Sequence, residues 1–396
     1  MKVVVITHNY IRRQGDLTAL YLHRLSSGLI EKGIEITVVC PHAPGLLTND
    51  VIDGVKIKRF SYPFSNIKPL VYSGHMHEEV AKSLFAKFVF LGLLKSFYSF
   101  ALKVCREEKA DLIWANWWIP PGLAAARIAQ KLGIPLVISS HGTDIALLSK
   151  PGITGKLSKY VYKRTSRATV VSTFLKEQLI KRVPYIKPDK IDIIPMPVGM
   201  EHFPLKEFKP KEIPIFLSVA RYTRQKRLFD IVYAADILNK EGLKFNIIMV
   251  GEGPLKTELH QVTQEKGIAE SFTIGPLVAQ QKLAQLYQEC DCVLLVSEGE
   301  GFGLILVEAG LTGRPVIGSK SGGITDVLRH DVNGLLIDLG DVNMLAKHMK
   351  SIILDIELKK RLGKEAHCIA TEKFGTPVIV EKVYQLFDQI IRRSDN

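Results

Sequence analysis

The stretch SEGEGFGLILVEAGLTGRPVIGSKSGG, residues 297–323, decides the predicted fold of this chain. It follows an apolar run, residues 292–296, of the kind that forms a fully buried parallel strand. Three glycines come within residues 299–303, and a helical run begins at Leu304. A strand, a glycine-rich turn and a helix start in this order leave backbone N–H groups unpaired at the positive end of the helix dipole. The stretch therefore predicts an anion-binding turn.

Two carboxylates belong to this turn and helix: Glu300 lies in the turn, and Glu308 lies eight residues further on, inside the helix. One interpretation is a Rossmann-like unit that happens to carry one surface and one helical glutamate. The pattern Glu-x7-Glu around Gly-Phe-Gly is, however, followed by GRPVI at residues 313–317 and SGG at residues 321–323. In this combination it resembles the signature of the retaining nucleotide-sugar glycosyltransferases of family 4, which have the GT-B fold.

The resemblance implies an α/β protein with the GT-B fold, in which two Rossmann-like domains with doubly wound parallel sheets face each other across a cleft. The chain is long enough for two cores, and its strand–helix–strand pattern starts at residues 3–6 and restarts at residues 215–220. We expect an acceptor-side domain over residues 1–205, a donor-side domain over residues 206–375, and a terminal helix over residues 376–396 that crosses back to the first domain.

Two further motifs follow predicted buried strands, where the active residues of open α/β sheets lie. His141 begins the motif HGTD directly after residues 135–139, at the place where the family carries its active-site histidine. Arg221 and Lys226, in the loop RYTRQK, have the spacing of the two cations that the family uses on the donor diphosphate. Arg227 comes next, where the family commonly has glycine, so the following helix is expected to begin differently.

Two loops resemble donor-contacting segments of the family to different degrees. The motif GPLV resembles the nucleobase-contacting loop and includes Leu277. The first loop of the family often carries two adjacent glycines, but here Gly15 is followed by Asp16, whose carboxylate does not favour phosphate. Compensation by Arg12 and Arg13 is one interpretation, and two solvated arginines are the other.

By resemblance, the chain is a metal-independent hexosyltransferase that moves a sugar from a UDP- or GDP-linked donor to a hydroxyl acceptor, with retention of anomeric configuration. Glu308 then holds the ribose, Glu300 contacts the donor sugar, and His141 lies by the sugar and the acceptor, from the opposite domain. Glu300 acting as a double-displacement nucleophile is the less favoured mechanism. The sequence contains no Asp-x-Asp for a metal, so Arg221, Lys226 and the turn are expected to stabilise the diphosphate by preorganised electrostatics. The donor-binding residues of the turn are Gly301, Phe302, Gly303 and Leu304.

Positive charge gathers in the first half of the chain. Residues 1–200 contain 28 Lys and Arg against 14 Asp and Glu, whereas residues 201–396 contain 25 against 26. This asymmetry predicts an anionic partner, such as a membrane surface, a phosphorylated or lipid-linked acceptor, or nucleic acid, unless it reflects a generally basic proteome. Apolar residues recur with helical spacing within residues 79–105, and lysines punctuate them. This pattern fits either a core helix whose other side is exposed to solvent or a helix that attaches the protein peripherally to a membrane.

Five scattered cysteines without a CxxC motif, and an N-terminus without signal-peptide anatomy, predict a cytoplasmic protein with reduced thiols, peripheral at the inner face of the membrane if it contacts a membrane. A metal site at His75 and His77 is poorly supported, because no further ligand of matching spacing follows. Trp117 and Trp118 favour an acceptor with an apolar or anionic part.

Two other functions stay open from the sequence. One is a nucleotide-sugar epimerase on the same fold, and the other is a non-catalytic module that binds a nucleotide sugar or a nucleic acid. The intact site residues argue against a decayed site, and no nucleic-acid partner is expected. The motif GEGP at residues 251–254 does not continue as GxGxxG, so a nicotinamide site is poorly supported.

Overall fold

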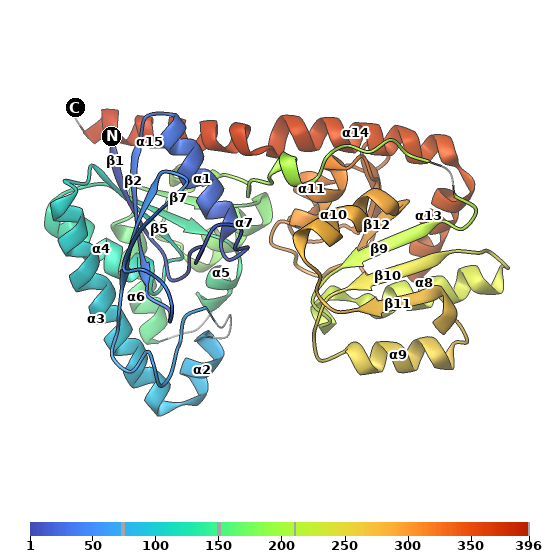
Figure 1. Ribbon diagram of the computed structural model, residues 1–396, viewed down its shortest axis with the longest axis horizontal. Coiled ribbons are helices and arrows are strands. Elements are labelled where there is room, and N and C mark those ends of the chain that lie inside the picture. Colours follow the sequence, from blue (N-terminus) through green and yellow to red (C-terminus); the bar gives the residue numbers. More distant parts are fainter. Residues whose placement is uncertain (73–75, 149–151, 210, 395–396) are drawn as a thin grey trace. The chain divides into compact units, whose positions relative to one another are not determined.

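A computed structural model describes residues 1–72, 76–148, 152–209 and 211–394 of the chain (Figure 1). The chain divides into two compact units, Met1–Pro197 with Ile379–Asn396, and Val198–Val378. The division falls at Pro197, a few residues before the predicted boundary at 205. The reason is that the segment after Pro197 packs on the second unit, where the ring of Phe203 meets the ring of Tyr287 edge to face at 5.7 Å.

The first unit contains an eight-stranded sheet in the order β3-β4-β2-β1-β5-β6-β7-β8. Its strands pair in parallel, except that β3 runs antiparallel to β4. The strands are β1 (Lys2–Ile6), β2 (Glu35–Pro41), β3 (Asn49–Ile52), β4 (Val55–Phe60), β5 (Leu112–Asn116), β6 (Leu136–Ser140), β7 (Arg167–Val170) and β8 (Ile191–Ile193). The α-helices of this unit are α1 (Leu20–Glu31), α2 (Met76–Lys82), α3 (Leu84–Glu107), α4 (Pro121–Leu132), α5 (Thr143–Leu147), α6 (Ile153–Lys163) and α7 (Thr173–Arg182), with a 3-10 turn η1 (Pro188–Lys190).

The second unit contains a six-stranded, fully parallel sheet in the order β11-β10-β9-β12-β13-β14. The strands are β9 (Ile215–Val219), β10 (Asn246–Val250), β11 (Phe272–Gly275), β12 (Cys292–Leu295), β13 (Val316–Ser319) and β14 (Gly334–Ile337). The helices are α8 (Leu228–Lys240), α9 (Lys256–Glu265), α10 (Gln280–Glu289), α11 (Leu304–Leu311), α12 (Ile324–Val327), α13 (Val342–Leu354) and α14 (Ile356–Phe374), with 3-10 turns η2 (Met200–His202), η3 (Arg224–Lys226) and η4 (Ala269–Ser271).

Both sheets reverse their winding direction at one place. In the second unit the chain moves outward from β9 to β11 and then returns to the other side of β9 with β12. In the first unit the same reversal falls between β1 and β5. Ligands of doubly wound sheets bind outside the carboxyl ends of the strands at such reversal points. The prediction of two doubly wound parallel-sheet domains is confirmed, and each domain has one such switch point.

Helix α15 (Thr376–Ser394) supplies one wall of the core of the first unit. The ring of Phe387 is fully buried and meets the ring of Trp114, on β5, at 5.4 Å between centroids. Gly28 of α1 leaves room for Val380, because a Cβ on this glycine would lie 2.5 Å from Val380 Cγ2. The residues that α15 places in this core are Ile379, Val380, Val383, Leu386, Phe387 and Ile390.

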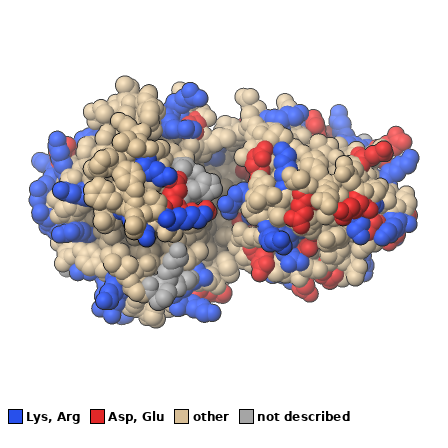
Figure 2. All heavy atoms as spheres, turned by 90° about the horizontal axis from the view of Figure 1, so that it is seen from below, with Lys and Arg blue, Asp and Glu red and all other residues tan. Residues whose placement is uncertain are grey.

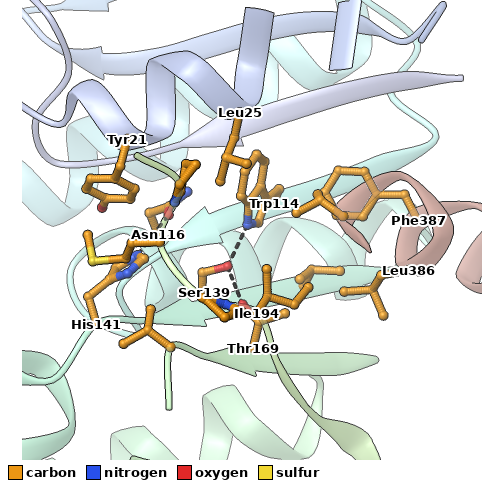
Figure 3. A pocket seen from close by; sticks show the side chains of 16 residues that line it. Tyr21, Leu25, Trp114, Asn116, Ser139, His141, Thr169, Ile194, Leu386 and Phe387 are labelled. Atoms are coloured by element: carbon orange, nitrogen blue, oxygen red, sulfur yellow. Dashed lines mark hydrogen bonds between the residues drawn. The ribbon is translucent and has the colours of Figure 1, made fainter. Parts of the chain in front are cut away.

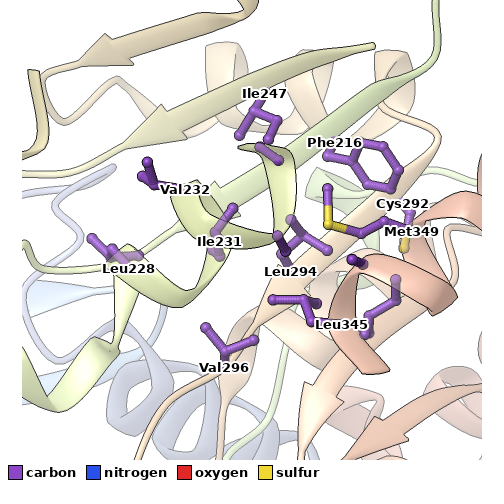
Figure 4. Packing of buried hydrophobic residues seen from close by; sticks show 14 of the residues in the cluster. Phe216, Leu228, Ile231, Val232, Ile247, Cys292, Leu294, Val296, Leu345 and Met349 are labelled. Carbon is purple, nitrogen blue, oxygen red and sulfur yellow. The ribbon is translucent and has the colours of Figure 1, made fainter. Parts of the chain in front are cut away.

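The second unit has its own core, which fills the space between its sheet and helices α8 and α13 (Figure 4). Beneath it lies a buried ion pair: the Asp291 carboxylate accepts from Lys359 of α14 at 3.1 Å and from the backbone N–H of Ile215 at 2.9 Å. A buried carboxylate with several donors is stable only while they stay in place. Asp291 therefore joins α14 to the starts of β9 and β12.

Helix α3 is a core helix on one side and exposes apolar side chains on another. Ala86, Val89, Leu93 and Phe97 are fully buried, so one side of the helix is a core element. Leu84, Phe88 and Leu91 nevertheless point to solvent. In the described part of the chain, α3 is the one helix long and apolar enough to cross a membrane by length and composition alone.

We expect Phe387→Ala to lower the free energy of unfolding by about 3–5 kcal/mol, because it deletes a fully buried ring and leaves a cavity beside Trp114. Urea denaturation of the full chain measures this loss. Leu354→Ala, at an exposed position of α13, is the control and should change stability by less than about 0.5 kcal/mol. A loss for Phe387→Ala no larger than that of the control would contradict the place of α15 in the first core.

Candidate active site

The glycine-rich turn joins β12 to α11, as the sequence predicted. Gly299 and Gly303 adopt φ values of 62° and 83°, in the left-handed region that favours glycine. The later SGG motif closes against the same turn, because a Cβ on Gly322 would lie 2.2 Å from the carbonyl oxygen of Glu300. The N–H of Gly323 donates to that oxygen at 2.7 Å. Two glycine motifs, twenty residues apart, thus build one compact turn at the N-terminus of α11.

The loops that follow β9 and β12 meet at the switch point of the second sheet. Lys226 Nζ lies 2.5 Å from Glu300 Oε2, and the two side chains are only 12% and 18% exposed. The backbones are joined as well, because the N–H of Glu298 donates to the carbonyl of Gln225 at 2.8 Å. The predicted diphosphate-binding lysine and the predicted sugar-contacting glutamate are therefore direct neighbours.

Arg221 begins the same loop. It is exposed, and its guanidinium has no hydrogen-bond or ion-pair partner among the residues that the structure describes. Behind it, Tyr222 is fully buried and donates its hydroxyl to the carbonyl of Gly275 at 2.6 Å. Gly251 allows the close approach of this loop, since a Cβ there would lie 1.8 Å from the carbonyl oxygen of Ala220. The glycines of GEGP thus support the cationic loop.

Arg227 occupies a place where the family commonly has glycine, and it adopts a left-handed backbone conformation. Its φ of 48° lies in the left-handed region, and it is the N-cap residue of α8. Its guanidinium pairs with Asp230 in the first turn of the helix, at 2.7 Å from Nε to Oδ2. This ion pair offsets part of the cost that a non-glycine residue incurs at positive φ. The departure of this chain from the family pattern is accommodated locally.

Glu308 is oriented by a residue that the sequence reasoning missed. The hydroxyl of Tyr287, on α10, donates to Glu308 Oε2 at 2.8 Å. Burial is the main cause that raises the pKa of Tyr287 well above its usual value, and the neighbouring Glu308 raises it further, so the phenol keeps its proton. Arg314 in turn holds the end of α10, because its Nε and Nη2 donate to the carbonyls of Tyr287 and Gln288 at 3.1 and 2.7 Å.

Three other predicted donor residues have different surroundings. Phe302 is buried, and its ring packs edge to face on Phe374 with 5.6 Å between centroids. Its ring therefore packs inside the second unit, and only its backbone remains for the predicted contact with a donor. Leu277 lies exposed in the loop between β11 and α10. Leu304 begins α11, where the first backbone N–H groups of the helix have no intrahelical acceptor.

In the first unit, polar side chains gather where three neighbouring strands end. His8 follows β1, Asn116 is the last residue of β5, and His141 follows β6. His141 Nε2 lies 3.1 Å from Asn116 Oδ1, which only accepts, so Nε2 carries the proton. His141 Nδ1 is then a bare acceptor. It has no partner in the described structure, and neither have His8 Nδ1 and Asn116 Nδ2. Three unpartnered polar atoms gathered at one place can bind either water or the polar groups of a ligand.

Both histidines of this cluster are neutral at neutral pH. Burial lowers the pKa of His141 to about 3, and the nearby His8 contributes to this shift. Burial lowers the pKa of His8 to about 4. Asp144 shapes the loop after β6, because its Oδ1 accepts from the N–H groups of His141 and Gly142 at 3.0 Å each.

Trp118 and the first loop differ from their sequence interpretations, whereas the ring of Trp117 lies 4.5 Å from the ring of His8. Trp118 is fully buried and donates its indole N–H to the carbonyl of Asp144 at 2.8 Å, so it does not face an acceptor. Gly15 has a φ of 79°, consistent with a tight turn. Asp16 beside it pairs with Arg12 at 2.7 Å, and this pairing lowers the pKa of the carboxyl. The Arg12 charge is therefore neutralised within the loop.

A small cavity of about 20 Å³ lies beside His141, lined by the ends of β5, β6 and β7, by α15 and by residues 194–197 (Figure 3). Trp114 Nε1 donates to Ser139 Oγ at 2.7 Å, and Ser139 Oγ lies 2.6 Å from Thr169 Oγ1. A space of this size holds one water molecule and no sugar. The residues around the cavity hold His141 and Asn116 in place, and the cavity itself is not a substrate site.

Of the two histidines considered for a metal site, His77 is described by the structure, and His75 lies outside the described residues. Within the described ranges, no group of three His, Cys, Asp or Glu side chains is placed to hold a metal ion. The cysteines are all free, and four of the five are buried.

Two Rossmann-like units with a paired cation and carboxylate at one switch point and a neutral histidine cluster at the other define a GT-B glycosyltransferase. Residues 18–202 match the family described as Glycosyltransferase Family 4, and residues 200–367 match the family described as Glycosyl transferases group 1. The chain belongs to glycosyltransferase family 4. The family and the fold predicted from residues 297–323 are confirmed.

Similar proteins agree with this assignment. The N-acetyl-alpha-D-glucosaminyl L-malate synthase of Bacillus anthracis is 27% identical over 338 residues, which cover 82% of this chain and 87% of that protein. A lipopolysaccharide core biosynthesis glycosyltransferase of Rhizobium meliloti is 23% identical over 96% of this chain and 98% of its own length. The sucrose-phosphate synthase of Thermosynechococcus elongatus shares the fold with a TM-score of 0.79 at 18% identity, covering 99% of this chain and all of that chain. HepE of Anabaena, solved in complex with UDP, superposes with a TM-score of 0.75 at 18% identity, covering 98% of this chain and all of that one.

We expect Tyr287→Phe to raise the Kd of the nucleotide about five- to tenfold, because the change removes the hydroxyl that orients Glu308 and keeps the ring. Isothermal titration of the nucleotide measures the effect. Tyr233→Phe, on the outer side of α8, is the matched control and should bind like wild type. Equal Kd values for Tyr287→Phe and the control would mean that the Tyr287 hydroxyl does not orient Glu308 for the nucleotide.

The stability of the protein should depend on His8 as the pH falls. The pKa of His8 is about 4 in the folded protein and about 6.5, its usual value, in the unfolded chain. His8 therefore does not reduce the free energy of unfolding above about pH 6.5, and it reduces this free energy increasingly as the pH falls below that value. Between about pH 7.5 and about pH 5.5, we expect His8 alone to cost about 1.4 kcal/mol of unfolding free energy. Urea denaturation of His8→Gln at the two pH values should not show this part of the loss. An identical pH dependence in wild type and variant would contradict a neutral, buried His8.

Proposed function

We propose that this protein is a retaining hexosyltransferase that moves a sugar from a UDP- or GDP-linked donor to a hydroxyl acceptor without the help of a metal ion. One observation carries the proposal, namely the meeting of the two switch-point loops of the second unit. Lys226 and Glu300 pair at 2.5 Å there, on the loop that also carries the exposed Arg221 and beside the N-terminus of α11. Such a constellation binds a diphosphate at one end and a polar sugar at the other.

The cations of this site act on the leaving diphosphate. Negative charge develops on the diphosphate as the bond to the anomeric carbon breaks. Glu300 holds the ammonium of Lys226 in place before a donor arrives, and the loop is fixed by the N–H of Glu298. Charges that are already positioned need no reorganisation in the transition state, which is the main electrostatic advantage of an enzyme site. The exposed Arg221 and the unpaired N–H groups at the start of α11 add to the same stabilisation.

The two glutamates have separate roles in this proposal. Glu308, oriented by Tyr287, accepts hydrogen bonds from the ribose hydroxyls. Glu300 gives Oε2 to Lys226, which leaves Oε1 to accept from a hydroxyl of the donor sugar. A carboxylate that is tied to an ammonium at 2.5 Å is a weak nucleophile. The pairing therefore favours attack by the acceptor on the face of the leaving group over double displacement at Glu300, and both routes retain the configuration.

His141 contributes an acceptor of hydrogen bonds. With Nε2–H donated to Asn116 and a pKa of about 3, the ring presents a neutral Nδ1 lone pair. Such a nitrogen orients a hydroxyl of the sugar or of the acceptor. Nδ1 carries no proton at neutral pH, so this atom does not act as a general acid.

The similar proteins narrow the range of proposed donors and acceptors. UDP in the HepE complex supports a UDP-linked donor. The names of the curated relatives support two kinds of acceptor, a small hydroxy acid and the core of a lipopolysaccharide. Together with the basic first half, these names favour a hydroxyl acceptor that is anionic or lipid-linked. The five free cysteines support a cytoplasmic location, and we extend this proposal to peripheral contact with the inner face of the membrane.

A donor screen tests the proposal. The full-length protein is mixed with UDP-glucose, UDP-N-acetylglucosamine, UDP-galactose and GDP-mannose in EDTA, and the melting shift and the slow hydrolysis of the donor are recorded. Stabilisation and hydrolysis with one of them support the proposal, and release of the α-anomer from an α-linked donor supports retention. A free epimer of the nucleotide sugar would instead indicate the epimerase. Response to none would overturn the proposal.

We expect Arg221→Ala and Lys226→Ala each to lower turnover about 30- to 1000-fold in EDTA, because each removes a charge that acts on the developing diphosphate. Steady-state kinetics with the donor found in the screen measure the loss. Arg224→Ala, in the same loop and also exposed, is the matched control and should retain most of the turnover. Rescue of either variant by Mg²⁺, with a metal dependence of the wild type, would contradict the metal-free role of these cations.

A further inference from the structure

Helix α3 and the loop before α2 form an exposed apolar surface, called here the apolar platform. Its members are Phe64, Ile67, Leu84, Phe85, Phe88 and Leu91. The ring of Phe64 meets the rings of Phe85 and Phe88 at 5.7 and 5.9 Å between centroids. Further along the helix, Gly92 lets the same loop approach, because a Cβ there would lie 3.2 Å from Pro63 Cδ. The platform is therefore one continuous surface built by two segments.

The core of the protein does not require this surface. Ala86, Val89 and Leu93 already bury the opposite side of the helix in the first unit. Leu84, Phe88 and Leu91 lie at positions i, i+4 and i+7 of a second stripe and are 82%, 58% and 64% exposed. Contiguous apolar surface of this kind on a folded protein marks a site of contact with a protein or a membrane.

Two exposed lysines of α3 lie on or beside the platform, and the carboxylates nearest to it in sequence, Glu78 and Glu79, belong to α2. Lys95 continues the exposed stripe at i+11, and Lys87 lies one residue from Phe88. Neither lysine has an ion-pair partner among the described residues. From Leu84 to Arg106, α3 carries no acidic residue. The face of the first unit seen in Figure 2, at the left, shows mostly Lys and Arg around uncharged surface, whereas the second unit shows both signs.

We propose that the apolar platform docks this protein on an anionic lipid surface. Leu84, Phe88 and Leu91 enter the boundary between headgroups and acyl chains, and Lys87 and Lys95 meet the anionic headgroups, as in amphipathic interfacial helices. This inference gives a defined surface to the membrane contact proposed above and rests on that contact, not on sugar transfer. It places a lipid-linked acceptor within reach of the protein that uses it.

Charge decides between a lipid surface and a second copy of the chain. In a two-fold dimer through the platform, Lys87 and Lys95 of one copy would approach the platform helix of the other, which carries lysines and no carboxylate from Leu84 to Arg106. A membrane that contains anionic lipid complements the lysines and covers the apolar side chains at once. A membrane-spanning arrangement is opposed by the buried side of α3, since Val89, Leu93 and Phe97 are part of the packed first unit.

Binding of the full-length protein to vesicles tests the proposal. Sedimentation is measured with vesicles of phosphatidylcholine alone and with vesicles that also contain phosphatidylglycerol. We expect binding only to the anionic vesicles. Phe88→Ser/Leu91→Ser should weaken it at least about tenfold, because two large side chains no longer enter the lipid. Lys87→Ser/Lys95→Ser should weaken it about 25-fold, at about fivefold for each lysine, and added salt should reduce the difference.

Two controls keep the result specific. Leu354→Ser removes an equally exposed leucine of the second unit, and Lys347→Ser/Lys364→Ser removes two exposed lysines there, and both variants should bind vesicles like wild type. Donor hydrolysis in EDTA, measured on every variant without vesicles, should stay at the wild-type rate, because no platform residue belongs to the site. Hydrolysis and vesicle binding are separate readouts, so either proposal can fail alone.

Four outcomes would overturn the inference. The first is no binding to anionic vesicles above the level with phosphatidylcholine. The second is binding that the platform variants leave unchanged. The third is a wild-type dimer in solution that Phe88→Ser/Leu91→Ser dissociates, which assigns the platform to a second copy. The fourth is retention on the vesicles after alkaline carbonate extraction, which indicates a spanning segment.

Discussion

The contact between the loops after β9 and β12 is the constraint on which the proposed donor site depends. These two strands are neighbours in the second sheet but are separated by more than seventy residues of sequence, and their loops meet because the winding of the sheet reverses between them. The Lys226–Glu300 ion pair, together with the backbone bond from Glu298 to Gln225, fixes the two loops to each other. Every other donor-side feature is arranged around this junction: the glycines shape it, Tyr222 supports it from below, and α11 begins beside it.

The two units use opposite electrostatic designs at equivalent places of their folds. At the switch point of the second unit, charged groups are paired and partly exposed, which suits a ligand that carries charge. At the switch point of the first unit, His8, Asn116 and His141 are neutral, crowded and left with unpaired polar atoms, which suits hydroxyl groups. A sugar diphosphate and a hydroxyl acceptor need these two kinds of environment. The contrast follows from burial, because a low dielectric keeps imidazole neutral but permits hydrogen bonds.

The sequence predicts the strand–turn–helix units, both parallel sheets and the family, because these depend on local patterns such as Glu-x7-Glu and on runs of apolar residues. It does not predict the pairing of Tyr287 with Glu308, since these residues lie on different helices and no local spacing relates them. The same holds for Asn116 and His141, which meet only because β5 and β6 are adjacent. Trp118 looks like a ligand-facing residue in sequence, but the fold buries it. Periodicity shows that α3 is apolar on one side, and only the packed structure shows that a second side is apolar as well.

A crystal structure of the protein with an intact nucleotide sugar, grown in the presence of EDTA, tests the central claim most directly. The account predicts the diphosphate oxygens on Arg221, Lys226 and the first N–H groups of α11, the ribose hydroxyls on Glu308, and a sugar hydroxyl on Glu300. A nucleotide bound away from the junction of the β9 and β12 loops, or a diphosphate that binds there only through a metal ion, would contradict it.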